Sequence, residues 1–113
     1  MDISFNRSKF QKIFNSKSEL NREYGDEQAR IIMRRMMVLK AAENLNDVSR
    51  LPPERCHELT GNLQNHFAID LKHPFRLIFL PNHEPLPKKD DGGIDLEKVS
   101  AIKIIEIKDY HKK

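Results

Sequence analysis

A central β-strand is predicted by the run Phe75-Arg76-Leu77-Ile78-Phe79-Leu80, in which Arg76 is the only charged residue. A turn at Lys72-His73-Pro74 precedes this run, and before the turn apolar residues alternate with others from Phe67 to Leu71. Such alternation is typical of a strand with one buried face. The middle of the chain therefore predicts two strands joined by a tight turn.

Further strands are predicted on both sides of this pair. Cys56 to Leu59 is a short strand candidate, followed by the turn residues Thr60-Gly61-Asn62. The segment from Pro81 to Lys98 holds too many Pro and Gly residues to join the core, and we expect it to be a polar loop. The last strand is Ala101-Ile102-Lys103-Ile104-Ile105-Glu106-Ile107, which leads into Asp109-Tyr110-His111.

The first half of the chain predicts helices. From Glu27 to Glu43 there is no Gly or Pro, and apolar side chains recur at helical spacing. They are Ala29, Ile32, Met33, Met36 and Leu39. A shorter helix is predicted from Ser18 to Tyr24, with Gly25 as the break and Asp26 as the cap of the longer helix. We interpret the two as a helical hairpin.

Together these patterns predict an α+β fold, in which an N-terminal helical hairpin packs on a small antiparallel β-sheet. Ile3 and Phe5 add a short first strand. The chain has 113 residues, with 38% hydrophobic and 33% charged residues and no visible linker. We therefore expect one globular domain over residues 1–113.

Composition also excludes several classes of protein. No apolar run is long enough to span a membrane, and Met1 to Phe5 lacks the apolar run of a signal peptide, so we expect a cytoplasmic protein with no membrane partner. Cys56 is the only cysteine, which excludes an internal disulfide and gives no zinc motif. We expect neither a metal nor a cofactor. The net charge of +3 favours an anionic partner.

Five residues are candidates for chemistry, because they can transfer protons or stabilise negative charge: His57, Arg76, Asp109, Tyr110 and His111. Histidine exchanges protons near neutral pH, and a neighbouring carboxylate can orient its ring. Arginine offers fixed donors that suit phosphate oxygens. The simpler alternative is that Arg76 is paired with an Asp or Glu and that His111 belongs to a frayed tail.

A family resemblance is carried by four segments taken together. They are Arg55-Cys56-His57-Glu58-Leu59-Thr60-Gly61, Phe67-Ala68-Ile69-Asp70-Leu71, Pro74-Phe75-Arg76-Leu77-Ile78-Phe79, and Ala101 to His111 with its terminal Asp-Tyr-His. In this order they resemble the plasmid-maintenance killer proteins, the HigB-like branch of the RelE/ParE toxin superfamily.

The resemblance implies a microbial RNase-like fold and a toxin that cleaves mRNA on the translating ribosome, acting as an endoribonuclease. It also implies neutralisation by a co-encoded helix-turn-helix antitoxin, and a free toxin that is a monomer. The family's strand histidine and arginine match His57 and Arg76. In place of a lysine often found before the glycine after the first strand, this chain has Thr60, so that phosphate-binding cation is either absent or supplied by Lys72 or Arg55.

In the mechanism we expect, the RNA 2′-hydroxyl attacks the adjacent phosphate and expels the 5′-oxygen. His111 acts as general base or acid, Asp109 orients it, and Arg76 stabilises the phosphate. His57 is the second proton-transfer group, and Tyr110 positions the phosphate or stacks on a base. The sequence leaves the assignment of base and acid open.

Other interpretations remain open at this stage. Arg30, Arg34, Arg35 and Lys72 can hold RNA phosphates, or the helix arginines can simply form a solvated face. The function can be that of a ParE-like toxin that binds DNA gyrase without cleaving RNA. It can also be that of a decayed toxin that only binds its antitoxin, which the loss of lysine at Thr60 makes worth testing.

Overall fold

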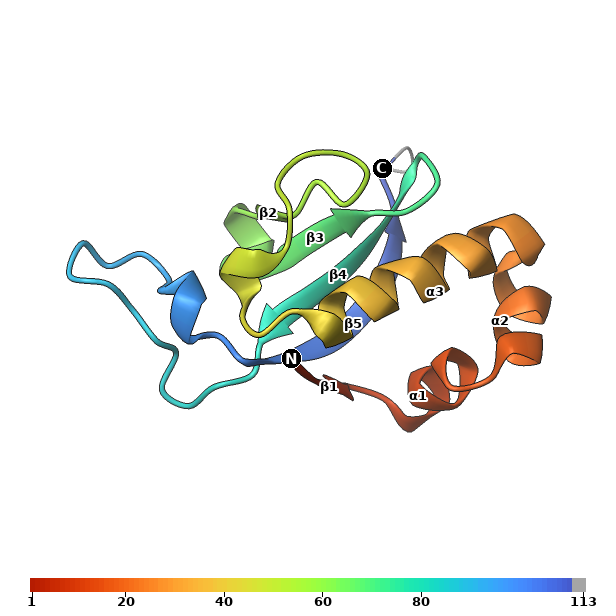
Figure 1. Ribbon diagram of the computed structural model, residues 1–113, viewed down its shortest axis with the longest axis horizontal. Helices are drawn as coiled ribbons and strands as arrows, with labels where there is room; N and C mark the ends of the chain where they lie inside the picture. The colour runs from red at the N-terminus through yellow and green to blue at the C-terminus, as the bar shows by residue number, and fades with distance from the viewer. Residues whose placement is uncertain (111–113) are drawn as a thin grey trace.

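The computed structural model describes residues 1–110, and over these residues the chain forms three α-helices and one five-stranded sheet (Figure 1). The helices are α1 (Ser8–Phe14), α2 (Lys17–Tyr24) and α3 (Asp26–Ala41). The strands are β1 (Asp2–Phe5), β2 (His57–Glu58), β3 (Phe67–Asp70), β4 (Phe75–Pro81) and β5 (Ala101–Asp109). The α+β class predicted from the sequence is confirmed. No helix of these described residues is both long and apolar enough to cross a membrane.

The sheet is mixed, and the prediction of an antiparallel sheet is wrong at one edge. Its strand order is β1-β5-β4-β3-β2, and β1 runs parallel to β5 while the other neighbours are antiparallel. A parallel pair needs a long crossover, and here the helices and β2 to β4 all lie between the two strands in the chain. Local sequence patterns carry no signal for such a distant pairing.

The helical hairpin predicted for the N-terminal half is not confirmed, because three helices follow one another there. α2 begins after Ser16, whose hydroxyl accepts a hydrogen bond from the Glu19 amide at 3.3 Å, so the cap lies two residues before Ser18. Gly25 precedes α3 with φ of 82°, a conformation that favours glycine, and Asp26 is the first helical residue rather than the cap. In Figure 1, α3 runs across the sheet, while α1 and α2 lie beyond it.

The main core lies between α3 and one face of the sheet. It includes Ala29, Ile32 and Leu39 from the helix and Ile69, Leu77, Phe79, Ile102 and Ile104 from the strands. Met33 and Met36, which the helical stripe also contained, are only partly buried. The loop before β5 adds Ile94, which is 7% exposed, so the expectation that this loop stays out of the core is wrong. The Ile94 side chain packs in the core although the residues around it form a loop.

The strand β3 is covered on both of its faces, whereas its alternation predicted one buried face. Phe67 and Ile69 join the core under α3, and Ala68 between them is also fully buried. Ala68 lies between His57 of β2 and Ile78 of β4 in the register of the sheet. The face away from α3 is therefore partly covered as well, and it carries the residues discussed below.

We predict that Leu39→Ala lowers the free energy of unfolding by about 2–5 kcal/mol, because it leaves a cavity where a fully buried side chain packs between α3 and the sheet. Met37 lies two residues earlier and is 70% exposed, so Met37→Ala is the matched control, with a change within about 0.5 kcal/mol. Urea unfolding followed by circular dichroism measures both. Equal losses in the two variants would contradict this packing.

Candidate functional site

One face of the sheet, opposite α3, gathers the polar side chains of its central strands. Asp70 of β3 is paired with Arg76 of β4, and Arg76 is paired with Lys108 of β5. His57 of β2 is paired with Ala68, two residues before Asp70, and therefore belongs to the same face. The sequence separation of these residues is large, and the strand register alone brings them together.

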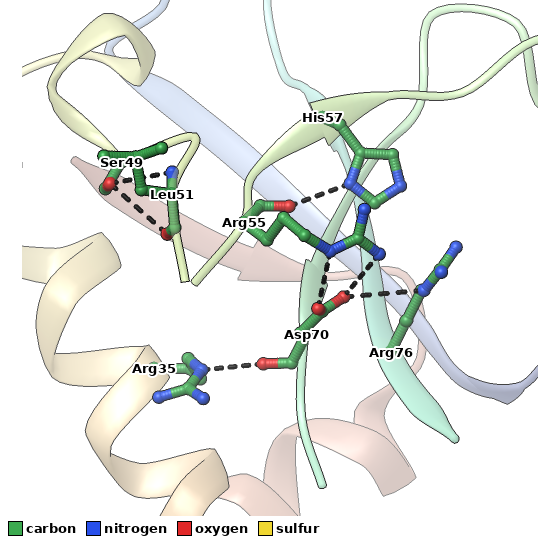
Figure 2. A network of polar contacts seen from close by, with 7 residues as sticks. All are labelled: Arg35, Ser49, Leu51, Arg55, His57, Asp70 and Arg76. Carbon is green, nitrogen blue, oxygen red and sulfur yellow. Dashed lines mark hydrogen bonds and ion pairs between the residues drawn. The ribbon is translucent and has the colours of Figure 1, made fainter. Parts of the chain in front are cut away.

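Asp70 is the centre of this polar face (Figure 2). Its carboxylate accepts two hydrogen bonds from Arg55, from Nε at 2.7 Å and from Nη2 at 3.1 Å. Nε of Arg76 lies 3.5 Å from the same carboxylate. The hydrogen bond from Arg55 to Asp70 raises the pKa of the Arg55 guanidinium, with the carboxylate's charge acting in the same direction. Asp70 thus contacts both arginines of this face.

Arg76 is also stacked on Tyr110. Its guanidinium carbon lies 4.2 Å from the centre of the Tyr110 ring, which is a cation–π contact. Lys108 approaches the same ring at 5.7 Å. The Tyr110 amide donates to the carbonyl oxygen of Pro74 at 3.1 Å, which fixes the end of β5 beside the turn before β4. Two of the predicted site residues, Arg76 and Tyr110, are therefore in contact.

A bulge in β5 decides which residues reach this face. Ile78 is paired with Glu106, but Phe79 is paired with Ile104, so Ile105 is an extra residue. Beyond the bulge Lys108 and Tyr110 share the face of Arg76, whereas Asp109 is paired with Phe75 and alternation directs it to the other face. The side chains of Asp109 and Tyr110 therefore lie on opposite faces of the sheet. His111 lies outside the described residues.

His57 has one ring nitrogen engaged by its own segment. Nδ1 lies 2.8 Å from the carbonyl oxygen of Arg55. Since a carbonyl oxygen only accepts, Nδ1 carries the hydrogen in this contact, and neutral His57 has its lone pair on Nε2. Such a ring is ready to take a proton at Nε2. The adjacent Cys56 is 6% exposed and belongs to the main core, as expected for neighbours on a strand.

A hollow opens beside the Arg76–Tyr110 contact. Its volume is about 90 Å³, and its polar walls come from Arg55, Asp70, His73, Arg76 and Tyr110. A water molecule occupies roughly 30 Å³ of liquid, so the hollow suits a group of a few heavy atoms. Two guanidinium groups at such a hollow favour a small anion, above all a phosphate group.

A comparison with protein families identifies the family to which this chain belongs. Residues 4–84 match the model of the HigB-like toxins, described as the RelE-like toxin of the type II toxin–antitoxin system HigB. The chain belongs to the RelE-like HigB toxin family. No curated protein matches the chain. Membership of a type II toxin–antitoxin family implies a co-encoded antitoxin as partner.

The HigB family match covers only part of the predicted site. His57 and Arg76 lie inside the matched residues, together with Arg55 and Asp70. Asp109, Tyr110 and His111 lie after them. The Arg76–Tyr110 contact thus joins the matched part of this HigB-like chain to the part that the family model does not reach.

The predicted RNA-binding cations are placed differently from one another. Arg30 and Arg34 are exposed on α3. Arg35 is buried, and its Nε donates to the Asp70 carbonyl oxygen at 2.7 Å, so it does not share the exposed position of Arg30 and Arg34. Arg35 is buried because it lies on the side of α3 that packs on the sheet. Lys72 forms an ion pair with Glu27 of α3, and this hydrogen bond and charge lower the pKa of the Glu27 carboxyl.

Sequence reasoning missed the central role of Asp70 in this HigB-like site. In the sequence Arg55 is a candidate phosphate-binding cation, and no local pattern gives Asp70 a partner. One signal was available: between Leu51 and Pro87 the Lys and Arg residues are Arg55, Lys72 and Arg76 alone. So few cations in a strand-rich segment favour specific pairing over a general basic surface.

We predict that Cys56 reacts slowly with thiol reagents in the folded protein. Burial raises the pKa of its thiol to about 11, so at pH 8 only roughly one molecule in a thousand carries the reactive thiolate. Labelling with iodoacetamide should be about a hundredfold slower, or more, than in the same protein unfolded in urea. Mass spectrometry of timed samples measures both rates, and equal rates would show that Cys56 is accessible.

Proposed function

We propose that this chain is a toxin that stops translation by cleaving mRNA on the ribosome. The observation that carries the proposal is the contact of Arg76 with Tyr110 at the small hollow, on the sheet face that also holds His57. A phosphate-binding cation, an aromatic ring and a proton acceptor are the parts that RNA cleavage by its own 2′-hydroxyl requires. Membership of the HigB family supports the same conclusion.

RNA enters with its scissile phosphate at the hollow beside Arg76. The guanidinium donates to the phosphate oxygens, where negative charge accumulates in the transition state. Tyr110 is 38% exposed, so its ring and hydroxyl are accessible to the nucleotide that carries this phosphate. Arg76 thus stabilises charge, and Tyr110 positions the substrate.

Proton transfer is assigned to the two histidines. His57 accepts the proton of the 2′-hydroxyl at Nε2, the nitrogen that its Nδ1 contact leaves with a lone pair. The 2′-oxygen then bonds to phosphorus and the bond to the 5′-oxygen breaks, giving a 2′,3′-cyclic phosphate. His111 is the acid that protonates the leaving 5′-oxygen. It directly follows Tyr110 in the sequence, and the negative charge of Asp109 is proposed to support its protonated form.

The wider surface provides contacts for the ribosome. Arg30 and Arg34 project from exposed positions of α3 and are proposed to bind ribosomal RNA phosphates. Lys72 takes part only where its ion pair with Glu27 opens. We further propose that residues 1–113 act as one domain and a free monomer in the cytoplasm, and that the antitoxin is a helix-turn-helix protein.

We predict that induction of the chain without antitoxin arrests growth, and that primer extension then reveals new 5′ ends within translated mRNA. Arg76→Ala should lower the cleavage rate in a reconstituted translation reaction by about a hundredfold to a thousandfold, because one donor to the developing charge is lost. His57→Ala should lower it by about a hundredfold or more. Lys12→Ala removes an exposed cation of α1 and is the control that should retain full activity.

Two results would overturn this proposal. Growth arrest with intact mRNA and signs of DNA damage would favour a toxin that acts on DNA gyrase. Absence of any toxicity, with retained binding of the antitoxin, would favour a decayed toxin.

A further inference from the structure

We propose that Asp70 is a positioning residue that holds Arg55 and Arg76 as a two-guanidinium clamp for the scissile phosphate. The inference rests on the proposed function, and it adds two residues to the site. Arg55 is assigned direct contact with the phosphate, and Asp70 is assigned the orientation of both arginines.

The positioning role of Asp70 is supported by which nitrogens of each guanidinium it contacts. Arg55 donates through Nε and Nη2, which leaves both hydrogens of Nη1 and one of Nη2 for a ligand. Arg76 faces Asp70 through Nε, so its two terminal nitrogens remain for a ligand. Within residues 1–110 these terminal nitrogens have no other hydrogen-bond partner. The Asp70 carboxylate therefore contacts each guanidinium mainly through Nε. The terminal N–H donors that suit phosphate oxygens stay largely available to a ligand.

Asp70 can act as a fixed point because its backbone is tied on both sides. Its amide donates to the carbonyl oxygen of Glu54 at 2.8 Å. Its own carbonyl oxygen accepts a hydrogen bond from Nε of the buried Arg35, which belongs to α3. α3, the sheet and the segment before β2 therefore set the position of the Asp70 carboxylate, and Figure 2 shows the Arg35 bond to its carbonyl oxygen.

The backbone of Arg55 points to the same conclusion. Arg55 adopts φ of 47°, the left-handed region that non-glycine residues rarely occupy. Its amide donates to the carbonyl oxygen of Leu51 at 3.0 Å, and its carbonyl oxygen accepts from Nδ1 of His57 at 2.8 Å. Such uncommon conformations persist where surrounding contacts hold them and are concentrated at functional sites. Arg55 thus connects the clamp to the ring proposed as the general base.

The charges and the burial of this cluster favour a role for Asp70 in orienting the two arginines rather than in neutralising them. The Asp70 and Arg76 side chains are only 29% and 27% exposed, so their attraction is less screened than that of a surface pair. Two cations and one anion leave the cluster with net positive charge. Donors already oriented before RNA arrives need little reorganisation as negative charge develops on the phosphate.

The test is Asp70→Asn, which keeps the shape of the side chain and removes its charge. We expect kcat for cleavage in a reconstituted translation reaction to fall about tenfold to a hundredfold, with KM nearly unchanged, because the clamp acts in the transition state. In an Arg55→Gln background the same change should have a smaller effect, since one of the two arginines through which Asp70 acts is already lost. Glu19→Gln removes the carboxylate of an exposed Arg22 pair and is the matched control.

Several outcomes would overturn the inference. Cleavage by Asp70→Asn at the wild-type rate or faster would mean that Asp70 is dispensable or masks the arginines. Equal losses in the wild-type and Arg55→Gln backgrounds would mean that Asp70 does not act through Arg55, so the two-arginine clamp would fail; thermal unfolding of each variant reports any loss of stability separately.

A second readout separates the clamp from the proposed function, because it involves no cleavage. In isotope-labelled protein, the Nε–Hε signals of Arg55 and Arg76 should shift together on titration with inorganic phosphate, and Asp70→Asn should abolish the joint shift. If the wild type shows this shift but cleaves no mRNA, the proposed function fails and the clamp stands. If the wild type cleaves mRNA and Asp70→Asn leaves the shift unchanged, the clamp fails.

Discussion

The hydrogen bonds and ion pairs of Asp70 connect three parts of the molecule that are distant in sequence. Through its carbonyl oxygen it is bonded to Arg35 of α3, and through its carboxylate to Arg55 and Arg76. Removing the charge of this carboxylate would leave two partly buried cations without their counter-ion. The packing of α3 on one face of the sheet is thereby linked to the arrangement of cations on the other. Asp70 thus takes part both in the packing of α3 on the sheet and in the polar cluster of the candidate site.

The bulge in β5 is the second constraint, since it sets which side chains after Ile105 reach Arg76. With the bulge, Lys108 and Tyr110 lie on the Arg76 face and Asp109 on the other. Without it, alternation would send Tyr110 toward the core side. One extra residue in a strand thus determines whether the Tyr110 ring can stack on Arg76.

Regular elements could be predicted because local patterns specify them. The run beginning at Phe75 forms β4, and the breaker-free stretch predicted from Glu27 to Glu43 forms α3 over Asp26–Ala41. Features that depend on distant partners could not be predicted in this way. The parallel pairing of β1 with β5, the burial of Arg35 and the bonding of Arg55 to Asp70 are of this kind. For the site, the sequence indicated Arg76 and Tyr110 but not what holds Arg76 in place.

The central claim is that RNA supplies its own nucleophile at the Arg76 face, and the chemistry of the cut ends tests it most directly. Fragments of translated mRNA should be isolated after brief induction and treated with polynucleotide kinase, with and without prior phosphatase. Attack by the 2′-hydroxyl leaves a 5′-hydroxyl on the downstream fragment, so efficient labelling without phosphatase is the predicted result. Labelling only after phosphatase would mean 5′-phosphate ends and attack by water, and would contradict the account.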